Sequence, residues 1–402
     1  MSSPRGQPPK VAVVAEFYPS RRDPVLGIWA HRQALAARDA GAEIRVLVLH
    51  RLVPPRASLA AGAGGAGKAL AGLLREPRRQ VRDGLPITYV PFLSPPREGH
   101  YPGWGAWAAP TLALALARLA RSFPFEIIHA HNAVPAGDAV RRAHPRAPLI
   151  VSVHGGDVLY TAGRGEAGAE AVAHGLGAAR LVLANSEGIA EMARACGADQ
   201  TRVVHLGADV PPAQRLSRAG GPPTLVTVAH LVARKRHADV LRALAVLGGR
   251  HPTLRYAIVG EGPERIALEG LAARLGVADR VDFHGQLAPA EAVERARRCT
   301  LFVMPSTEEA FGVAYIEAMA AGVPAIGCRG EPGPEEIAAA GDGFMLVPPG
   351  DIERLTQRID ELLSDPQRLR EAGQRARASV AAHFTWERCG EQTLAAYRHV
   401  LR

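Results

Sequence analysis

The sequence has few cysteines, few aromatic residues and no long apolar run. Its four cysteines are scattered without a Cys-x-x-Cys pair, so neither a zinc site nor a disulfide framework is indicated, and we interpret them as small buried residues. No run of 18 or more uncharged apolar residues occurs, so no helix is expected to span a bilayer. The apolar run 11–15 is too short for the core of a signal peptide. We therefore expect a cytoplasmic protein.

The charge is divided unevenly along the chain. Residues 1–220 carry 26 Lys and Arg against 16 Asp and Glu, whereas residues 221–402 carry 22 against 23. A basic N-terminal half suits nucleic acids, anionic lipid headgroups or phosphorylated substrates. Since only three of the 48 basic residues are lysines, codon bias towards arginine and a plain solvated surface are an equal alternative. Aromatic side chains do not interleave with the basic ones, so a nucleic-acid partner is not expected.

Short apolar runs alternate with helical stretches, which is typical of βαβ units and a parallel sheet. The expected strands are 11–15, 44–49, 127–129, 149–153 and 181–184 in the first half, then 225–228, 256–259, 281–283, 301–304 and 324–326. A helix over 28–40, ended by Gly41, follows the first strand. This order predicts an α/β fold of two Rossmann-like, doubly wound domains that face each other across a ligand-binding cleft.

A segment rich in proline and glycine separates the two series of strands. The expected organisation is an N-terminal domain over 1–210, a linker over 211–223, a C-terminal domain over 224–384 and a final helix over 385–402. Within the first domain, the Gly/Ala segment 60–67 is predicted to be a mobile loop. The basic and aromatic residues between Arg75 and Trp107 suit either a membrane interface or an insertion packed by its own rings.

The most informative segment runs from Pro305 to Pro324, with the sequence PSTEEAFGVAYIEAMAAGVP. A strand is expected to end just before it and a helix to begin near Gly312, where free N–H groups and the helix dipole favour a diphosphate. Glu309 would project from the loop, and Glu317 would offer a carboxylate on the helix to two ribose hydroxyls. On spacing alone, two solvated surface glutamates are an equal interpretation.

The full string resembles the Glu-x7-Glu motif of family 4 retaining glycosyltransferases, which have the GT-B fold. The resemblance implies that Glu309 contacts the transferred sugar near the reacting carbon and that Glu317 binds the ribose. It places the backbone of Phe311, Gly312 and Val313 against the sugar and the phosphates. The donor is then a nucleotide-diphosphate sugar, bound in the C-terminal domain, and the N-terminal domain binds the acceptor.

Residues 228–237 resemble the Gly-Arg-Leu-x-x-x-Lys-Gly segment with which this family neutralises the diphosphate. Lys235 occupies the lysine position, where a cation stabilises the charge on the departing nucleoside diphosphate. His230, however, stands at the arginine position. Either Arg234 or Arg236 compensates, or His230 supplies a weaker donor.

Three further stretches fall in the order of the family. Gly260 and Gly262 match its strand-end turn, and His284 matches the loop whose backbone holds the base. Gly260-x-Gly262 lacks the third glycine of a dinucleotide fingerprint, so NAD is not expected. Gly27 resembles the glycine at the tip of the loop after the first strand, beside the donor phosphates. The Pro-x-x-Gly-Ile-x-x-x-x-Gln form around it is similar to enzymes that build envelope polysaccharides such as teichuronic acid.

His154, in the stretch Val-His-Gly-Gly-Asp, matches the family histidine near the sugar and the acceptor. A neutral imidazole there would orient hydroxyls, and a buried, hydrogen-bonded histidine is the alternative. His129 and His131 suggest a metal by their spacing, but no third ligand is evident and the family needs none. We expect neither metal nor cofactor.

These observations predict a retaining hexosyltransferase that acts in envelope polysaccharide or glycolipid synthesis. Its catalytic residues would be Glu309, His154 and Lys235. The basic N-terminal domain favours an anionic or lipid-linked saccharide acceptor and peripheral association with the inner membrane. A nucleotide-sugar epimerase, a phosphorylase-like enzyme or a non-catalytic protein of the same fold remain alternatives, because a fold alone does not determine function.

Overall fold

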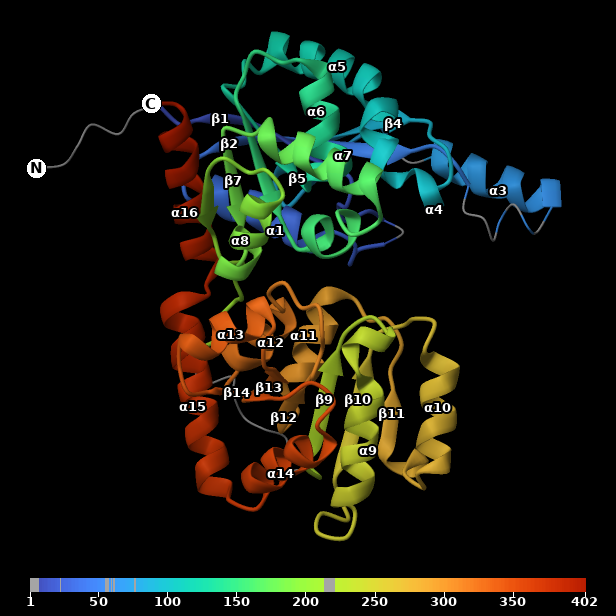
Figure 1. Ribbon diagram of the computed structural model, residues 1–402, viewed down its shortest axis with the longest axis vertical. Coiled ribbons are helices and arrows are strands. Elements are labelled where there is room, and N and C mark those ends of the chain that lie inside the picture. Colours follow the sequence, from blue (N-terminus) through green and yellow to red (C-terminus); the bar gives the residue numbers. More distant parts are fainter. Residues whose placement is uncertain are drawn as a thin grey trace, which may run out of the picture. The chain divides into compact units, whose positions relative to one another are not determined.

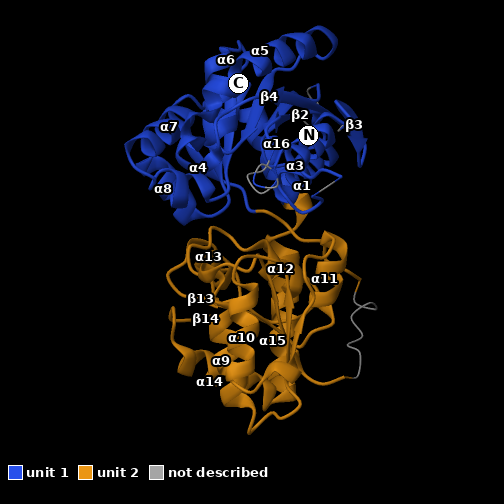
Figure 2. Cartoon of the chain, turned by 90° about the vertical axis from the view of Figure 1, so that its right-hand side faces the viewer, with its two compact units in different colours: residues 1–205, 389–402 blue, residues 206–388 orange. Residues whose placement is uncertain are grey.

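The protein is described here by a computed structural model, which describes residues 7–21, 23–54, 58, 60, 62–75, 77–212 and 221–402. The chain divides into two compact units, coloured separately in Figure 2. Unit 1 comprises Met1–His205 and Cys389–Arg402, and unit 2 comprises Leu206–Arg388. The division therefore precedes the expected linker 211–223, of which residues 213–220 lie outside the described residues.

Unit 1 contains an eight-stranded sheet in the order β3-β4-β2-β1-β5-β6-β7-β8, in which only the β3–β4 pair is antiparallel. The strands are β1 Lys10–Ala15, β2 Glu43–Arg51, β3 Arg79–Arg82, β4 Leu85–Phe92, β5 Ile127–His131, β6 Leu149–Val153, β7 Leu181–Ala184 and β8 Thr201–Val203. Strands β5, β6 and β7 are buried along their whole length, as expected for parallel strands covered on both faces.

The helices of unit 1 include one that returns from the end of the chain. They are α1 Ile28–Asp39, α3 Gly62–Leu74, α4 Arg97–His100, α5 Trp104–Ser122, α6 Asp138–Ala143, α7 Glu166–Gly177, α8 Glu187–Ala195 and α16 Trp386–Val400. Helix α16 packs closely on α1, because an added Cβ at Gly390 would overlap the backbone of Ala36. Gln33 also donates a hydrogen bond to Thr393 across this contact, at 3.2 Å.

Unit 2 contains a six-stranded, fully parallel sheet in the order β11-β10-β9-β12-β13-β14. The strands are β9 Thr224–Val228, β10 Arg255–Val259, β11 Val281–Phe283, β12 Leu301–Val303, β13 Ala325–Cys328 and β14 Phe344–Val347. The helices are α9 His237–Leu247, α10 Arg265–Arg274, α11 Pro289–Arg297, α12 Val313–Ala320, α13 Pro332–Ala339, α14 Ile352–Leu363 and α15 Pro366–His383. Each unit thus alternates strand and helix around a parallel sheet (Figure 1), which confirms the predicted Rossmann-like architecture.

The segment 60–67 was predicted to be a loop, and this prediction was wrong. Residues 62–67 belong to the start of α3, which Figure 1 shows extending away from the sheet of unit 1. Glycine and alanine do not exclude a helix, although glycine weakens one. No helix in the described part of the chain is long and apolar enough to span a bilayer.

The aromatic segment is packed in part. Tyr101 and Trp104 are buried, whereas Trp107 on α5 is 54% exposed. The four cysteines are unpaired, and Cys299, Cys328 and Cys389 are buried as expected.

Candidate functional site

A sharply turned loop precedes helix α12 in unit 2. The loop follows β12 and ends at Gly312, which has a φ of +89° and begins the helix. An added Cβ at Gly312 would overlap the ring of Tyr315, so only glycine fits this position. Glu308 also adopts a left-handed conformation, with a φ of +56°. The loop therefore holds a strained backbone next to the free N–H groups of a helix, a combination found at functional sites.

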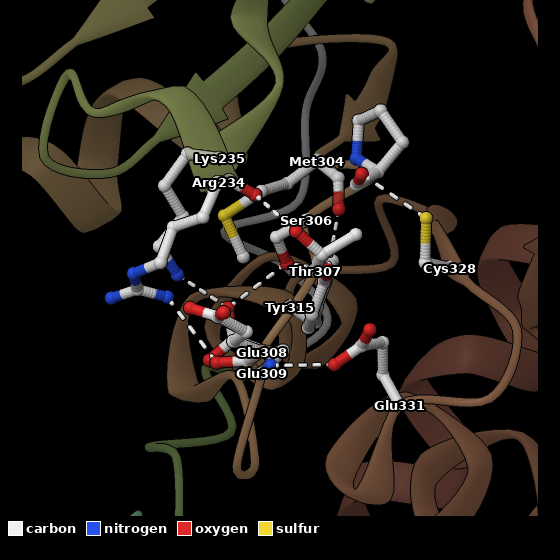
Figure 3. Close-up of polar contacts among 11 residues, drawn as sticks. Arg234, Lys235, Met304, Ser306, Thr307, Glu308, Glu309, Tyr315, Cys328 and Glu331 are labelled. Atoms are coloured by element: carbon white, nitrogen blue, oxygen red, sulfur yellow. Dashed lines mark hydrogen bonds and ion pairs between the residues drawn. The ribbon is translucent and has the colours of Figure 1, made fainter. Parts of the chain in front are cut away.

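Glu309 and Lys235 form an ion pair at the centre of this loop (Figure 3). Lys235 lies in the turn Ala233–Lys235 after β9, and its Nζ donates to Oε2 of Glu309. The two side chains are only 11% and 10% exposed. Ser306 Oγ donates a second hydrogen bond to the same carboxylate oxygen, at 3.0 Å. Two residues 74 positions apart are thus brought into one partly desolvated contact, which joins the two sequence motifs.

The electrostatics keep Glu309 ionised. Burial alone would raise its pKa, but the Lys235 ammonium, its hydrogen bond, Arg234 and Ser306 together hold the pKa below the usual range. A carboxylate in this state is a poor proton donor at neutral pH. Instead, it places a fixed negative charge where a cationic transition state would be stabilised.

In residues 228–237, three side chains are candidates for the donor that the missing arginine would supply. Arg236 is committed elsewhere, since its Nε donates to Asp239 at 2.5 Å. Arg234 faces the site, where its Nη1 lies 3.4 Å from the carbonyl of Glu308 and its charge lowers the pKa of Glu309. His230 is exposed at the carboxyl end of β9. The structure therefore places Arg234 beside Lys235 as the second cation.

Sequence reasoning missed three residues that shape the loop. Ser306 is fully buried and bonds Glu309, and its hydroxyl is 3.1 Å from that of Tyr315. Glu331, in the loop before α13, accepts the backbone N–H of Glu309 at 2.8 Å. The Ser306–Glu309 spacing of three residues could have indicated the first contact. No local pattern links Glu331 to a residue 22 positions earlier.

The other residues around α12 that were predicted to bind the donor substrate differ in how far their side chains are buried. The Phe311 side chain is buried against Phe384, with the ring centroids 5.8 Å apart, so only its backbone can face a ligand. Val313 and Glu317 are half-buried, in the first and second turns of the helix respectively. Val313 is the first residue of α12, where backbone N–H groups have no acceptor within the helix.

The remaining predicted residues of unit 2 lie at the carboxyl ends of β9, β10 and β11. Gly260 and Gly262 pack tightly on the segment after β9, because an added Cβ would overlap Ala229 or Leu231. His284 is half-buried, and its Nε2 is 2.7 Å from an Arg295 guanidinium nitrogen. Burial, and then the Arg295 charge, lowers the pKa of His284, so its ring is a neutral acceptor.

Gly27 and His154 lie in unit 1. Gly27 has a φ of +72°, and an added Cβ would overlap the backbone of Phe17, so it closes the loop between β1 and α1 tightly. His154 follows β6, and its Nε2 is 2.9 Å from Nδ1 of His131, on the neighbouring strand β5. The two imidazole rings are stacked, with centroids 5.2 Å apart.

A third buried histidine, His129, links this pair to the C-terminal helix α16. His129 lies 2.8 Å from both Ser152 Oγ and the hydroxyl of Tyr397 on α16. Burial lowers the pKa of His129 and of His154 to about 3, so both rings are neutral. Among the described residues, no three His, Cys, Asp or Glu side chains group so that they could hold a metal ion.

Comparison with known families agrees with both halves of the chain. The family model described as Glycosyl transferases group 1 matches residues 213–379, and the one described as Glycosyltransferase Family 4 matches residues 69–210. Together these matches cover the loop before α12 and most of unit 1.

Two curated relatives indicate the range of similarity. A D-inositol 3-phosphate glycosyltransferase of Nocardia farcinica is 31% identical over 322 residues, which are 73% of this chain and 71% of the relative. A GDP-mannose-dependent alpha-(1-6)-phosphatidylinositol monomannoside mannosyltransferase of Mycolicibacterium smegmatis is 32% identical over 178 residues, 42% of this chain and 46% of the relative. In the Mycolicibacterium smegmatis relative and in two others, the match spans less than half the length of the relative, at 46%, 16% and 37%.

Solved structures share the fold over nearly the whole chain. Sucrose-phosphate synthase of Thermosynechococcus elongatus superposes with a TM-score of 0.76 at 22% identity, covering 98% of this chain and 99% of that structure. The Anabaena protein HepE, in complex with UDP and glucose, gives a TM-score of 0.71 at 20% identity, covering 97% and 99%.

Proposed function

Because the chain belongs to family 4 of the glycosyltransferases, we propose that it is a retaining hexosyltransferase that uses a nucleotide-diphosphate sugar. The observation that carries this proposal is the Glu309–Lys235 pair beside the N-terminus of α12. It brings a fixed carboxylate, two cations and free backbone N–H groups to one loop. These are the charges that glycosyl transfer from a diphosphate leaving group requires.

The residues take the following roles. The Glu309 carboxylate stabilises positive charge at the reacting carbon as the bond to the diphosphate breaks. Lys235, Arg234 and the backbone N–H groups at Phe311–Val313 stabilise the negative charge on the departing diphosphate. Lys235 has three N–H donors, so the bond to Glu309 leaves two for phosphate oxygens. Glu317 binds the ribose.

Retention follows from a front-face displacement. The acceptor oxygen bonds to the anomeric carbon on the face from which the diphosphate leaves, and the leaving phosphate takes the acceptor proton. This scheme needs no nucleophilic carboxylate and no metal or cofactor. The Glu309 carboxylate is bound by Lys235 and Ser306 and remains an electrostatic group.

The test is release of nucleoside diphosphate from UDP-, GDP- and ADP-sugars, with and without saccharide acceptors. Glu309→Ala is expected to lower turnover by about 10²–10³-fold, similar to the loss when one oxyanion-hole hydrogen-bond donor is removed. Glu353→Gln, an exposed glutamate on α14, is the matched control and keeps its turnover. Near-normal transfer by Glu309→Ala, or a product of inverted anomeric configuration by NMR, contradicts the proposal.

The acceptor in this proposal is an anionic or lipid-linked saccharide, and the reaction belongs to envelope polysaccharide or glycolipid synthesis. The names of the relatives support this class: one uses an inositol phosphate and another a phosphatidylinositol monomannoside. The protein would work on the cytoplasmic face of the membrane as a peripheral enzyme.

Helix α3 supports this location. It has no buried residue, and Leu70 and Leu74 are 39% and 64% exposed. Five of its 13 residues are glycines, and a glycine-rich helix of this length is marginal in water without a partner surface. Lys68 and the exposed Arg75, Arg78 and Arg79 supply charge for an anionic surface.

Vesicle co-sedimentation tests the location. Vesicles of phosphatidylglycerol are expected to bind the protein at low salt, and vesicles of phosphatidylcholine to bind it weakly. Leu70→Glu/Leu74→Glu is expected to abolish binding. Ile266→Glu, which changes an 83% exposed residue of unit 2, leaves it unchanged. Equal binding by the α3 variant contradicts the membrane role of this helix.

A further inference from the structure

Three side chains form a continuous hydrogen-bonded chain in unit 1, outside the donor residues of unit 2. The hydroxyl of Tyr18 lies 2.8 Å from Nδ1 of His31, and Nε2 of the same ring lies 2.8 Å from Oδ2 of Asp83. Tyr18 follows β1, His31 lies on α1, and Asp83 is in the turn between β3 and β4. Three separate segments thus meet at one imidazole ring.

The carboxylate fixes the direction of both hydrogen bonds. An ionised Asp83 can only accept, so neutral His31 carries its proton on Nε2, and its Nδ1 then accepts from the Tyr18 hydroxyl. Burial is the main effect on the pKa of His31 and lowers it, whereas the hydrogen bond and the charge of Asp83 raise it. The charges of Arg82 and Arg32 lower the pKa as well. The net pKa lies below the usual range, so the ring is neutral at pH 7 and can accept from the hydroxyl.

This hydrogen-bonded chain attaches the β3–β4 hairpin to the loop between β1 and α1. Tyr18 and His31 are only 3% and 1% exposed, so water is not available as an alternative partner for the bond between them. The Asp83 side chain is 64% exposed and keeps its charge in contact with solvent. Arg82 makes a second contact with the same loop, since its Nη2 donates to the carbonyl of Ser20 at 3.2 Å. One hairpin therefore holds the loop at two points.

The loop lies where the strand order of the sheet reverses. Strand β1 is flanked by β2 on one side and by β5 on the other, and ligands of open α/β sheets bind at such a switch point, outside the carboxyl ends of the strands. Trp29, two residues before His31 on α1, has its ring centroid 6.0 Å from that of His154. The contacts of His31 thus hold backbone that adjoins one of the predicted catalytic residues.

We propose that His31 is a positioning residue of this enzyme. Asp83 orients its imidazole, and the imidazole holds Tyr18, and with it the loop after β1, in the conformation that the reaction needs. The inference rests on the proposed function, because the reaction is that transfer. His31 is buried, so it acts through the loop rather than on a substrate. A protonated ring carries a hydrogen on Nδ1 and no longer accepts from Tyr18, so the support is lost as the pH falls below the unfolded pKa of ~6.5.

Hydrogen–deuterium exchange tests the contact without any substrate. Four backbone N–H groups have partners within the loop and report its opening, those of Ser20, Asp23, Val25 and Leu26. His31→Leu leaves the Tyr18 hydroxyl without its acceptor and is expected to accelerate exchange by about fivefold or more, the effect of one lost hydrogen bond. His31→Asn, whose amide oxygen can replace Nδ1, restores slow exchange. His174→Gln, at a 51% exposed residue on α7, is the matched control and exchanges like the wild type.

The pH dependence of exchange separates a titrating His31 from one that is merely packed. After correction for the intrinsic rate, exchange of the wild-type loop is expected to accelerate by up to about tenfold per pH unit below ~6.5. The asparagine of His31→Asn does not titrate, so its loop is expected to keep slow exchange as the pH falls through the same range.

Kinetic measurements test the link to the reaction. Release of nucleoside diphosphate is measured from UDP-glucose, GDP-mannose and ADP-glucose, with water or glucose 6-phosphate as the acceptor. His31→Leu is expected to lower the rate by about tenfold or more, because a small displacement far from the reacting atoms lowers rates strongly, and His31→Asn to restore most of it. Donor binding, measured by thermal unfolding, is expected to stay unchanged, since the donor residues lie in unit 2.

Three results would overturn the inference: wild-type loop exchange in His31→Leu, equal acid acceleration in the wild type and His31→Asn, or a wild-type rate from a His31→Leu protein whose loop exchanges fast. If His31→Leu does not fold, Tyr18→Phe removes the same hydrogen bond from the other side and takes its place. If the wild type releases nucleoside diphosphate and His31→Leu does so equally well, only this inference fails. If the wild type releases none from any donor, the proposed function fails and the positioning role with it.

Discussion

Removal of Lys235 is expected to destabilise unit 2 as well as to abolish transfer. The Lys235 and Glu309 side chains are 11% and 10% exposed, so Lys235→Met leaves a carboxylate buried without its cation. Breaking a buried ion pair in this way costs about 3–5 kcal/mol. The double variant Lys235→Met/Glu309→Gln removes both charges, and its amide keeps the hydrogen bond from Ser306. We expect it to recover about 2 kcal/mol or more of that loss.

The pH dependence of this deficit gives a second test. Burial raises the pKa of Glu309, and Lys235 is the main group that lowers it again. Without Lys235 the folded state takes up a proton more readily than the unfolded chain. The deficit of Lys235→Met therefore grows as the pH rises above the unfolded glutamate pKa of ~4.3 and shrinks as the pH falls towards it.

The assay is urea unfolding of the full chain, followed by hydrogen–deuterium exchange of peptides from unit 2 so that this unit is measured by itself. Both variants are expected to lack transferase activity, which separates stability from catalysis. A Lys235→Met protein as stable as the wild type, or a double variant less stable than the single one, would refute the reasoning about a desolvated pair.

Three other predictions concern the backbone and the histidines. Gly312→Ala is expected to destabilise unit 2 by about 1–3 kcal/mol or more, because Gly312 has a positive φ and an added Cβ would overlap the Tyr315 ring. The control Gly249→Ala has open space around it and is expected to leave the free energy of urea unfolding nearly unchanged. Equal stabilities of the two variants would contradict this. The unfolded chain binds a proton at His129 below a pKa of ~6.5, whereas the folded one, with a pKa of about 3, does not. The free energy of unfolding of His129→Gln is therefore expected to fall by about 2 kcal/mol less than that of the wild type between pH 7 and pH 5. Parallel stability curves would rule out a buried neutral His129. Nitrogen-15 NMR is expected to show His131 and His154 as neutral rings at pH 6, because burial lowers the pKa of both and one proton lies between His131 Nδ1 and His154 Nε2. An imidazolium signal from either ring at pH 6 would contradict it.

Ten strands were predictable because their apolar runs are short, buried and bounded by turns. The strands β3, β4, β8 and β14 were missed. Pro86 and Pro91 interrupt the run of β4, and charged residues dominate β3. The strands β8 and β14 are short and only partly buried, and each lies at the edge of its sheet. The helix α3 was missed since its composition is that of a loop, and nothing in its sequence pattern indicates a buried face. The local sequence pattern therefore predicts elements that are buried in the core. It does not predict exposed helices or most strands at sheet edges.

The site residues were also predictable where local sequence carries the signal, and not where a tertiary contact does. Glu309, Gly312 and Lys235 lie in contiguous motifs whose order along the chain is informative. Arg234 rather than Arg236 is the second cation near Glu309, because Arg236 is bound by Asp239, three residues later in the sequence. The support from Glu331 depends on a loop that only the folded sheet brings close. Roles that rest on such tertiary contacts were beyond the sequence.

The central claim is that unit 2 binds a nucleotide sugar at the start of α12. The most direct measurement is thermal unfolding with UDP-, GDP- and ADP-sugars, for the wild type and Glu317→Gln. A ligand at 100 times its Kd adds about 2.7 kcal/mol, which raises the melting temperature of a unit this size by several degrees. We predict such a rise with one nucleotide class and its loss in Glu317→Gln. No rise with any donor, or one that Glu317→Gln leaves unchanged, would contradict the assignment of the donor site.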